Sequence, residues 1–208
     1  MRLHHEQLSP ALAAKLAELD CWALSVATLA ELAGALFGAD PGHAMRSGKE
    51  RGIIVRIKFG ASADRLAPEF TALAAQVARL RAAVPSGGEL SVAAFFHLRF
   101  QNIHPLRDGN GRLGRLLLAE QCRRGYGVPV PAFLAAFHDY AEDYRQVFAA
   151  PQPAFQFELM VDLLARLLGV PVPTALVLPG PLSPVYPERN TKLAPQRRGP
   201  SGMIRGDR

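Results

Sequence analysis

Residues 104–115 carry the side chains best suited to chemistry, in the order His-Pro-Leu-Arg-Asp-Gly-Asn-Gly-Arg-Leu-Gly-Arg. Pro105 disfavours helical geometry at His104, so a preceding helix should end just before this histidine. Asp-Gly and Asn-Gly turn dipeptides follow, and the chain from Arg112 onward is helical in character. The segment is therefore predicted to be a helix, a glycine-rich turn and a second helix.

Such a turn directs free N–H groups and the positive end of the second helix dipole onto one small volume, which favours phosphate binding. Gly109 and Gly111 leave room for close backbone approach. Arg112 and Arg115 are three residues apart, so they share a helix face and can contact the same polyphosphate. Asp108 offers a hard oxygen ligand for the Mg²⁺ that accompanies nucleotides.

His104 is the candidate proton acceptor at the edge of this turn, because an ordinary histidine pKa near 6.5 leaves neutral imidazole available at neutral pH. Other interpretations exist for each residue. His104 could only hydrogen-bond a helix end, Asp108 could only form a turn, Asn110 could only cap a helix, and the two arginines could be solvated. Their occurrence together within twelve residues favours the catalytic interpretation.

This pattern resembles the signature of the Fic (filamentation induced by cAMP) family, usually written His-Pro-Phe-x-(Asp/Glu)-Gly-Asn-Gly-Arg-x-x-Arg. Leu106 stands where that family usually has Phe, which should reduce packing beneath the loop rather than change its chemistry. The resemblance extends over about residues 20–168. It includes a Val-Arg-Ile stretch at 55–57, similar to the family's target-binding flap, and a helix before the motif marked by Ala94, His97, Phe100 and Ile103.

The resemblance implies a protein adenylyltransferase, which binds ATP with Mg²⁺ and transfers AMP to a hydroxyl of a target protein. His104 would be the general base, Asp108 the metal ligand, and Asn110 a further phosphate contact. The target would be held in extended form by the flap residues Ile54, Val55, Arg56, Ile57 and Lys58. Transfer of another nucleotide, phosphocholine or a phosphoryl group is the alternative among enzymes. The family's kinases depart from the Gly-Asn-Gly-Arg core that this chain keeps, which favours AMP. A catalytically silent interaction module is the alternative from a different class.

Many Fic proteins also carry an inhibitory helix, Ser/Thr-x-x-x-Glu-Gly/Asn, whose glutamate pairs with the second arginine of the motif, here Arg115. The nearest candidate is Glu31, but Ala27 stands where the hydroxyl belongs and Leu32 where Gly or Asn belongs. Glu31 could still reach Arg115 unaided. A tight internal lock is therefore not expected, and control should come from a separate antitoxin-like inhibitor or be absent.

The elements that position the loop are predicted to form an all-α domain, a Fic-type helical bundle with a small β-hairpin flap. Residues 38–50 are predicted to be loop. Residues 53–59 alternate as one strand, with a partner in 44–50 or 61–66. Ser91 should cap the helix before the motif, and Phe155 should lie on a buried face. The helices are expected at about 9–19, 22–37, 68–84, 91–103, 112–125, 131–148 and 154–168.

Composition sets the remaining limits. The chain has 208 residues, of which 49% are hydrophobic and 20% charged, as expected for one globular domain (1–169) followed by a Pro-rich, basic and extended or disordered tail (170–208). No uninterrupted apolar run could span a membrane, and neither a signal peptide nor a cysteine framework is visible, so a cytoplasmic setting is expected. Residues 188–208 carry six basic and two acidic side chains, which supplies most of the +6 net charge. The near-neutral remainder disfavours nucleic-acid binding by the domain.

Overall fold

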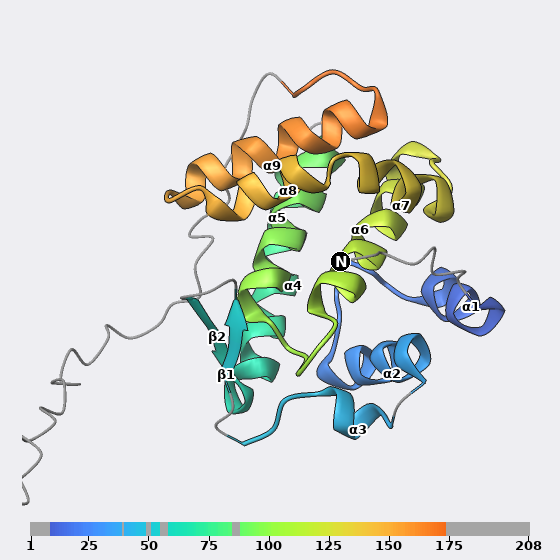
Figure 1. The fold of residues 1–208 in the computed structure, drawn as a ribbon, viewed down its shortest axis with the longest axis vertical. Helices are drawn as coiled ribbons and strands as arrows, with labels where there is room; N and C mark the ends of the chain where they lie inside the picture. Colours follow the sequence, from blue (N-terminus) through green and yellow to red (C-terminus); the bar gives the residue numbers. More distant parts are fainter. Residues whose placement is uncertain (1–8, 39, 49–50, 55–57, 85–87, 174–208) are drawn as a thin grey trace, which may run out of the picture.

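The computed structural model describes residues 9–38, 40–48, 51–54, 58–84 and 88–173, which form a helical bundle with one two-stranded sheet (Figure 1). This arrangement confirms the predicted all-α fold with a small β-hairpin. Within these ranges, no helix is both long and apolar enough to cross a bilayer. The elements are α1 (Pro10–Glu18), α2 (Val26–Phe37), α3 (Pro41–Ala44), β1 (Arg51–Ile54), β2 (Lys58–Ser62), a 3₁₀ turn (Ala63–Arg65), α4 (Leu66–Ala83), α5 (Glu89–Ile103), α6 (Asn110–Tyr126), α7 (Val130–Asp139), α8 (Ala141–Ala149) and α9 (Pro153–Leu168).

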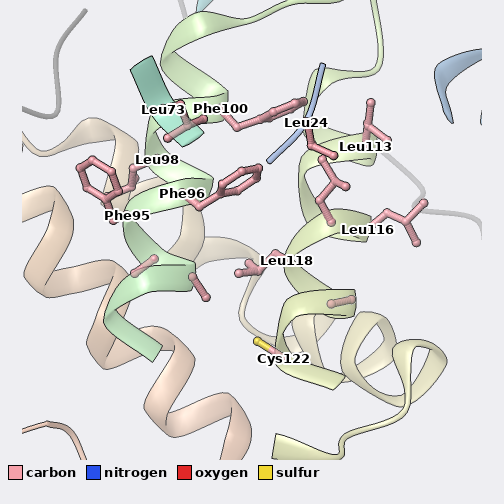
Figure 2. Close-up of a cluster of buried hydrophobic side chains, with 14 of the residues drawn as sticks. Leu24, Leu73, Phe95, Phe96, Leu98, Phe100, Leu113, Leu116, Leu118 and Cys122 are labelled. Carbon is pink, nitrogen blue, oxygen red and sulfur yellow. The ribbon is translucent and has the colours of Figure 1, made fainter. Parts of the chain in front are cut away.

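Helix α5 runs through the middle of the bundle and is buried on nearly every side (Figure 1). Of its 15 residues, 13 are buried, and a helix enclosed on all faces belongs in the interior of a fold. Phe95, Phe96 and Phe100 share one hydrophobic cluster with Leu113 and Leu116 of α6 (Figure 2). Helices α4, α6 and α9 pack around α5. The loop between α5 and α6 is therefore anchored at both ends in the core.

Helices α5 and α6 approach each other closely at Gly114. A Cβ atom at this position would lie 2.2 Å from Gln101 Nε2 and 3.1 Å from Phe100 Cδ1. Gln101 also donates a hydrogen bond from Nε2 to the carbonyl oxygen of Asn110, at 3.2 Å. These contacts hold α5 and α6 together close to the loop that connects them.

The prediction of a single strand over residues 53–59 is wrong, because this stretch is divided between the two strands of a hairpin. Strands β1 and β2 are antiparallel, with Ile53 opposite Phe59 and Ile54 opposite Lys58. Residues 55–57, which include three of the predicted flap residues, lie outside the described residues. Opposite residues of an antiparallel pair share a face, so an alternating pattern can continue from one strand into the next. The alternation of residues 53–59 was therefore not enough to distinguish a hairpin from a single strand.

Several predicted helix boundaries are also wrong. Helix α2 begins at Val26 rather than near 22, because Ser25 caps it: Ser25 Oγ accepts a hydrogen bond from the Thr28 N–H at 3.0 Å. Helix α5 begins directly after Gly88, so Ser91, the predicted cap, is a buried residue inside the helix. The predicted loop 38–50 contains the short helix α3.

The predicted helix 131–148 is two helices, α7 and α8, which meet at Tyr140. Its aromatic residues pack across the junction, with ring centroids 4.9 Å apart for Phe137 and Tyr144 and 5.0 Å apart for Tyr144 and Phe148. The aromatic residues of both helices pack into the same cluster. Their spacing in the sequence therefore still looks like that of one helix, although the helix is interrupted at Tyr140. The junction was therefore not visible in the spacing.

The prediction that Phe155 is buried is wrong: this residue is 48% exposed, because α9 turns Phe157 and Met160 inward instead.

The two cysteines, Cys21 and Cys122, are free and buried. Burial raises their pKa values to about 11 and about 12, so both are protonated thiols at neutral pH.

Candidate active site

Residues 104–115 form the connection between α5 and α6 and the first turns of α6. His104 ends α5 in the left-handed region, with φ 54° and ψ 61°, and it is the one non-glycine residue with positive φ in the part of the chain that the structure describes. The expected helix end before Pro105 is confirmed. Left-handed geometry is uncommon for histidine, so the surrounding structure must hold this residue in place.

Residues 44–46, which we call the strap, hold the loop from outside. Met45 forms an antiparallel bridge with Leu106. The Arg46 N–H donates to the carbonyl of Pro105 at 3.2 Å, and the Arg107 N–H donates to the carbonyl of Ala44 at 3.1 Å. The loop is therefore fixed by a segment about 60 residues away in the chain, from a range predicted to have no regular structure.

Arg46 is a site residue that the sequence analysis missed. Its side chain is buried, with Nε donating to the carbonyl oxygen of His104 at 2.6 Å and Nη2 donating to that of Ile103 at 3.0 Å. These carbonyls are at the end of α5, where a helix leaves acceptors unsatisfied and a cation is favourable. Arg46 therefore fixes the backbone from which the His104 imidazole projects. A lone arginine in an apparent loop gave no sequence signal for this role.

The hydrogen bonding of the His104 ring determines which nitrogen can act as a base. Nδ1 lies 3.3 Å from the carbonyl oxygen of Gln101, and because a carbonyl only accepts, Nδ1 carries the proton. Nε2 therefore holds the free lone pair. Burial lowers the pKa of His104, the Gln101 carbonyl partly offsets this effect, and the charge of Arg46 lowers the pKa further.

If His104 is the base, the rate of the predicted transfer reaction should fall on the acid side as this histidine becomes protonated. We predict that this fall occurs below pH 6.5, the ordinary pKa of histidine. The lowered pKa keeps Nε2 unprotonated as the pH falls through 6.5, so the base is lost only at a lower pH. The measurement is kcat/KM over about pH 5–8, with thermal unfolding followed at the same pH values to exclude denaturation. An acid limb at or above 6.5 would contradict the assignment of His104 as a partly buried base with a lowered pKa.

The Asn110 side chain forms hydrogen bonds with the backbone of Leu106 in the same loop. Its side chain is 3% exposed; Oδ1 accepts from the Leu106 N–H at 2.8 Å and Nδ2 donates to the Leu106 carbonyl at 2.9 Å. The alternative of Asn110 as the helix cap is wrong, because Gly109 is the cap residue and Asn110 is the first residue of α6. The left-handed φ of 84° at Gly109 explains the shift, since glycine adopts it without strain.

The first turn of α6 supplies the predicted phosphate-binding amides. The first N–H groups of a helix have no intrahelical acceptor, and here they belong to Asn110, Gly111 and Arg112. A Cβ at Gly109 would lie 2.2 Å from Phe37 Cζ, so the ring of Phe37 packs against the turn. Phe37 is a second site residue that the sequence analysis missed, because it comes from α2.

Arg112 and Arg115, expected to share a helix face, have different partners in the structure. Arg112 lies over the ring of Phe37 at 4.3 Å and donates to Asp108 Oδ2 at 3.3 Å. Burial raises the pKa of Tyr144, and the charge of Arg115 partly offsets this rise. Arg115 Nη1 lies 3.2 Å from the position of a Cβ at Gly111. Both guanidinium groups thus lie at the turn: Arg112 is beside Phe37 and Asp108, and Arg115 is beside Gly111.

Asp108 fits the predicted role of a magnesium ligand. Its carboxylate is 94% exposed, and it accepts hydrogen bonds from the Gly109 N–H at 2.7 Å and from Arg112. Mg²⁺ is usually held by one or two carboxylates together with substrate phosphates and water. Among the described residues, no group of three or more His, Cys, Asp or Glu could hold a metal ion without a substrate. Asp108 is therefore the residue that would hold Mg²⁺ arriving with a nucleotide.

The hairpin lies directly against His104 through Gly60 of β2. A Cβ at Gly60 would lie 2.8 Å from both the Cβ of His104 and the carbonyl oxygen of Ile103. The hairpin residues Ile54 and Lys58 pair at the end of the sheet leading to residues 55–57. The structure therefore brings strand β2, through Gly60, next to the predicted base.

We predict that Gly60→Ala lowers kcat by about 10–100-fold, because the new methyl group must displace the backbone at His104 and small misplacements of a catalytic group are costly. Affinity for ATP, the predicted nucleotide, should change little, since the predicted phosphate site lies on α6. Initial-rate kinetics and calorimetry measure the two effects. The control is Gly125→Ala, at an exposed helical position where a Cβ meets only ordinary contacts of 3.5 Å or more. Equal losses in both variants would show that the Gly60 contact has no special role.

Glu31, the candidate inhibitory residue, lies on α2 and pairs with Lys15 of α1 at 3.3 Å. Both side chains are exposed, and a pair of this kind contributes about 0–1 kcal/mol. Within the described ranges, Glu31 forms its ion pair with Lys15 and none with Arg115. The contact considered for Glu31 in the sequence analysis is therefore not formed in this structure.

Comparison with known families places the site in context. Residues 24–122 match the family model described as the Fic/DOC family, and this range includes the hairpin and all of residues 104–115. No curated protein matches the sequence.

Two solved structures resemble the fold. One is a Fic family protein from Desulfovibrio desulfuricans G20, with a TM-score of 0.57 and 23% identity over 76% of this chain and 48% of that protein. The other is a Fic domain containing signaling protein from Bacteroides thetaiotaomicron VPI-5482, with a TM-score of 0.52 and 20% identity over 76% of this chain and 64% of that protein. The chain thus spans about half the length of the first and under two thirds of the second. It has the Fic fold.

Proposed function

We propose, from the Fic/DOC match and the Fic fold, that this chain transfers AMP from ATP to a hydroxyl side chain of a target protein. The family match supports protein modification by nucleotide transfer in general, while the choice of AMP rests on the intact Gly-Asn-Gly-Arg core. The observation that carries the proposal is the placement of an unprotonated His104 Nε2 on the loop that leads into the open first turn of α6.

In the proposed reaction, His104 Nε2 removes the proton of the target hydroxyl while its oxygen attacks the α-phosphorus of ATP. A bond forms between that oxygen and the α-phosphorus, the bond to the oxygen bridging the α- and β-phosphorus atoms breaks, and pyrophosphate leaves with the bonding electrons. The N–H groups of the first turn of α6, together with Arg112 and Arg115, stabilise the charge that develops on the leaving group. Asp108 would hold Mg²⁺, which neutralises phosphate charge when bound.

The target protein is proposed to dock on the hairpin. An exposed strand edge can pair with an extended peptide through main-chain hydrogen bonds, which do not require a particular target sequence. The contact of Gly60 with His104 supports this placement, because a peptide added beside β1 or β2 would enter next to the base. Ile54, Val55, Arg56, Ile57 and Lys58 remain the proposed docking residues, with 55–57 outside the described residues.

Incubation of the protein in a cell lysate with ATP labelled at either the α- or the γ-phosphate tests the reaction. Protein labelled from the α-position only is the expected result. Label from the γ-position only would identify a kinase, and label from neither would exclude both reactions with ATP. Parallel incubations with α-labelled CTP, GTP and UTP distinguish transfer of another nucleotide. His104→Asn should abolish any specific labelling.

Two alternatives of other classes have separate tests. A catalytically silent module would produce no labelling, although His104, Asp108 and both arginines are intact. Nucleic-acid binding through the basic tail is tested by deleting residues 188–208 and measuring salt-dependent retention on DNA.

Control by a separate antitoxin-like protein is proposed, because Glu31 is paired with Lys15 and lacks the surrounding inhibitory motif. Expression of the wild-type chain alone should then be poorly tolerated, whereas His104→Ala should be harmless. A wild-type protein that stays inactive until Glu31→Gly is introduced would mean that the lock is internal.

A further inference from the structure

One residue of the strap, Arg46, donates hydrogen bonds to three successive carbonyl groups at the end of α5 and the start of the loop. Its backbone N–H donates to the carbonyl oxygen of Pro105 at 3.2 Å, its Nε to that of His104 at 2.6 Å and its Nη2 to that of Ile103 at 3.0 Å. Carbonyls at the end of a helix lack an intrahelical donor, and a buried acceptor without a donor is costly. Because Arg46 is itself only 6% exposed, these bonds constrain the backbone that they join.

The conformation that these bonds hold at His104 is one that the local sequence disfavours. His104 has φ 54° and ψ 61°, in the left-handed region, where a residue with a Cβ atom is strained. The next residue is Pro105, and a residue before proline prefers extended geometry. Without a restraint from elsewhere in the chain, His104 is therefore expected to become extended, which would turn its imidazole in another direction.

The two sides of His104 are restrained by different parts of the chain. On the helix side, the His104 N–H donates to the carbonyl oxygen of Phe100 at 3.0 Å, as expected at a helix end. On the loop side, the His104 carbonyl accepts from Arg46. The Asn110 side chain binds the backbone of Leu106, two residues further along. Loss of the Arg46 side chain should therefore disturb His104 while the first turn of α6 keeps its own bonds.

We propose that Arg46 is a positioning residue for the general base: its hydrogen bonds keep His104 in the left-handed conformation and so direct the imidazole toward the target hydroxyl. This inference rests on the proposed function, because the direction matters for catalysis only if His104 accepts a proton. A misplacement of about 1 Å can cost roughly 100-fold in rate, so a residue that acts through the backbone can have a large kinetic effect. Arginine suits this role, because its planar guanidinium donates in several fixed directions.

Nuclear magnetic resonance tests the conformational part of the proposal without reference to any reaction. In protein isotopically labelled in histidine only, the Cα and Cβ chemical shifts of His104 distinguish left-handed from extended backbone. His104→Asn identifies the resonance, because it removes one of the six histidine signals. Arg46→Met keeps an unbranched apolar side chain and removes the side-chain donors, so the His104 resonance should move toward the values of extended backbone. An unchanged resonance would overturn the proposal.

Kinetics test the catalytic part. With saturating α-labelled ATP in a fixed cell lysate, the initial rate of protein labelling should fall by about 10–100-fold in Arg46→Met, whereas the Kd for ATP, measured by calorimetry, should change by less than about twofold. Arg46→Lys keeps the charge but replaces the planar fork by one nitrogen, so its rate should be intermediate, about 3–10-fold below that of the wild type. Arg46→Lys also serves if Arg46→Met does not fold, and a wild-type rate and resonance in Arg46→Lys would then overturn the proposal.

Arg124 provides a matched control at another helix end. Its Nη2 donates to the carbonyl oxygens at the end of α1, which belong to Leu16, Ala17 and Leu19, at 2.9, 3.1 and 2.7 Å. Arg124→Met therefore also removes hydrogen bonds from arginine to backbone carbonyls, but far along α6 from His104. It should lower stability while the labelling rate per folded molecule and the His104 resonance remain those of the wild type. Equal losses of rate in Arg124→Met and Arg46→Met would mean that both act through general stability, and the positioning role would be wrong.

The remaining outcomes separate this proposal from the proposed function. If the wild-type chain labels protein and Arg46→Met does so at the same rate, the proposed function stands and the positioning role is wrong. If Arg46→Met loses ATP affinity together with rate, Arg46 holds the first turn of α6 rather than the base, and the positioning role is again wrong. If the wild-type chain labels no protein, the proposed function fails, and the resonance alone decides whether Arg46 holds His104.

Discussion

Replacing His104 is expected to lower the rate of AMP transfer by about 10²–10⁴-fold, the usual contribution of a general base, while ATP affinity changes by less than about threefold. The proposed base and the proposed phosphate site are separable because the His104 imidazole extends from the end of α5, whereas the amides proposed to bind phosphate belong to α6. Single-turnover rates with α-labelled ATP measure the first quantity and calorimetry measures the second.

The choice of substitution matters because His104 has φ 54°. Alanine is strained in this region by about 1–2 kcal/mol, whereas asparagine tolerates it, so His104→Asn separates the loss of the base from a loss of stability. His138→Ala removes an exposed histidine of α7 and is the matched control. If His104→Asn abolished ATP binding with an intact circular dichroism spectrum, the histidine would hold the loop rather than accept the proton.

Asn110→Ala is expected to lower the free energy of unfolding by about 2–4 kcal/mol and to abolish ATP binding. The alanine leaves both the N–H and the carbonyl of Leu106 without their partners, and an unsatisfied buried polar group costs about 1–3 kcal/mol. Leu106 is fully buried, so solvent does not reach it directly. Without these two bonds we expect the loop to lose the arrangement in which the first turn of α6 is proposed to bind phosphate.

Denaturant unfolding and calorimetry measure the two effects of Asn110→Ala. Arg107→Ala is the control from the same loop; Arg107 is exposed and donates to Ser47 Oγ at the surface, so its loss should cost less than about 1 kcal/mol. If Asn110→Ala were as stable as Arg107→Ala, water would be replacing the amide, and Asn110 would have no structural role in the loop.

The site residues that could be predicted from the sequence are those whose positions follow from local geometry. Pro105 and the two glycines after Asp108 determine where α5 ends and α6 begins, and these constraints act over a few residues. The carboxylate of Asp108 and the first-turn amides then follow from helix geometry. The central position of α5 follows in the same way from apolar side chains on all its faces.

The residues that were missed come from other parts of the chain. Arg46 and Phe37 reach the site from a loop and from the end of α2, and no spacing rule relates them to residues 104–115. The hairpin was misassigned for the opposite reason. Its alternation is local, but two antiparallel strands that are close in the sequence can show the same alternation as one strand.

The close crossing at Gly114 has a consequence for how this site can change during evolution. Any side chain at position 114 would collide with the amide of Gln101, so a substitution at position 114 requires a substitution at position 101 as well. A relative with a larger residue at 114 must carry a shorter one at 101, and would lose the bond from that amide to the Asn110 carbonyl. The geometry of the loop between α5 and α6 therefore depends on the spacing of these two helices, and substitutions that change one also change the other.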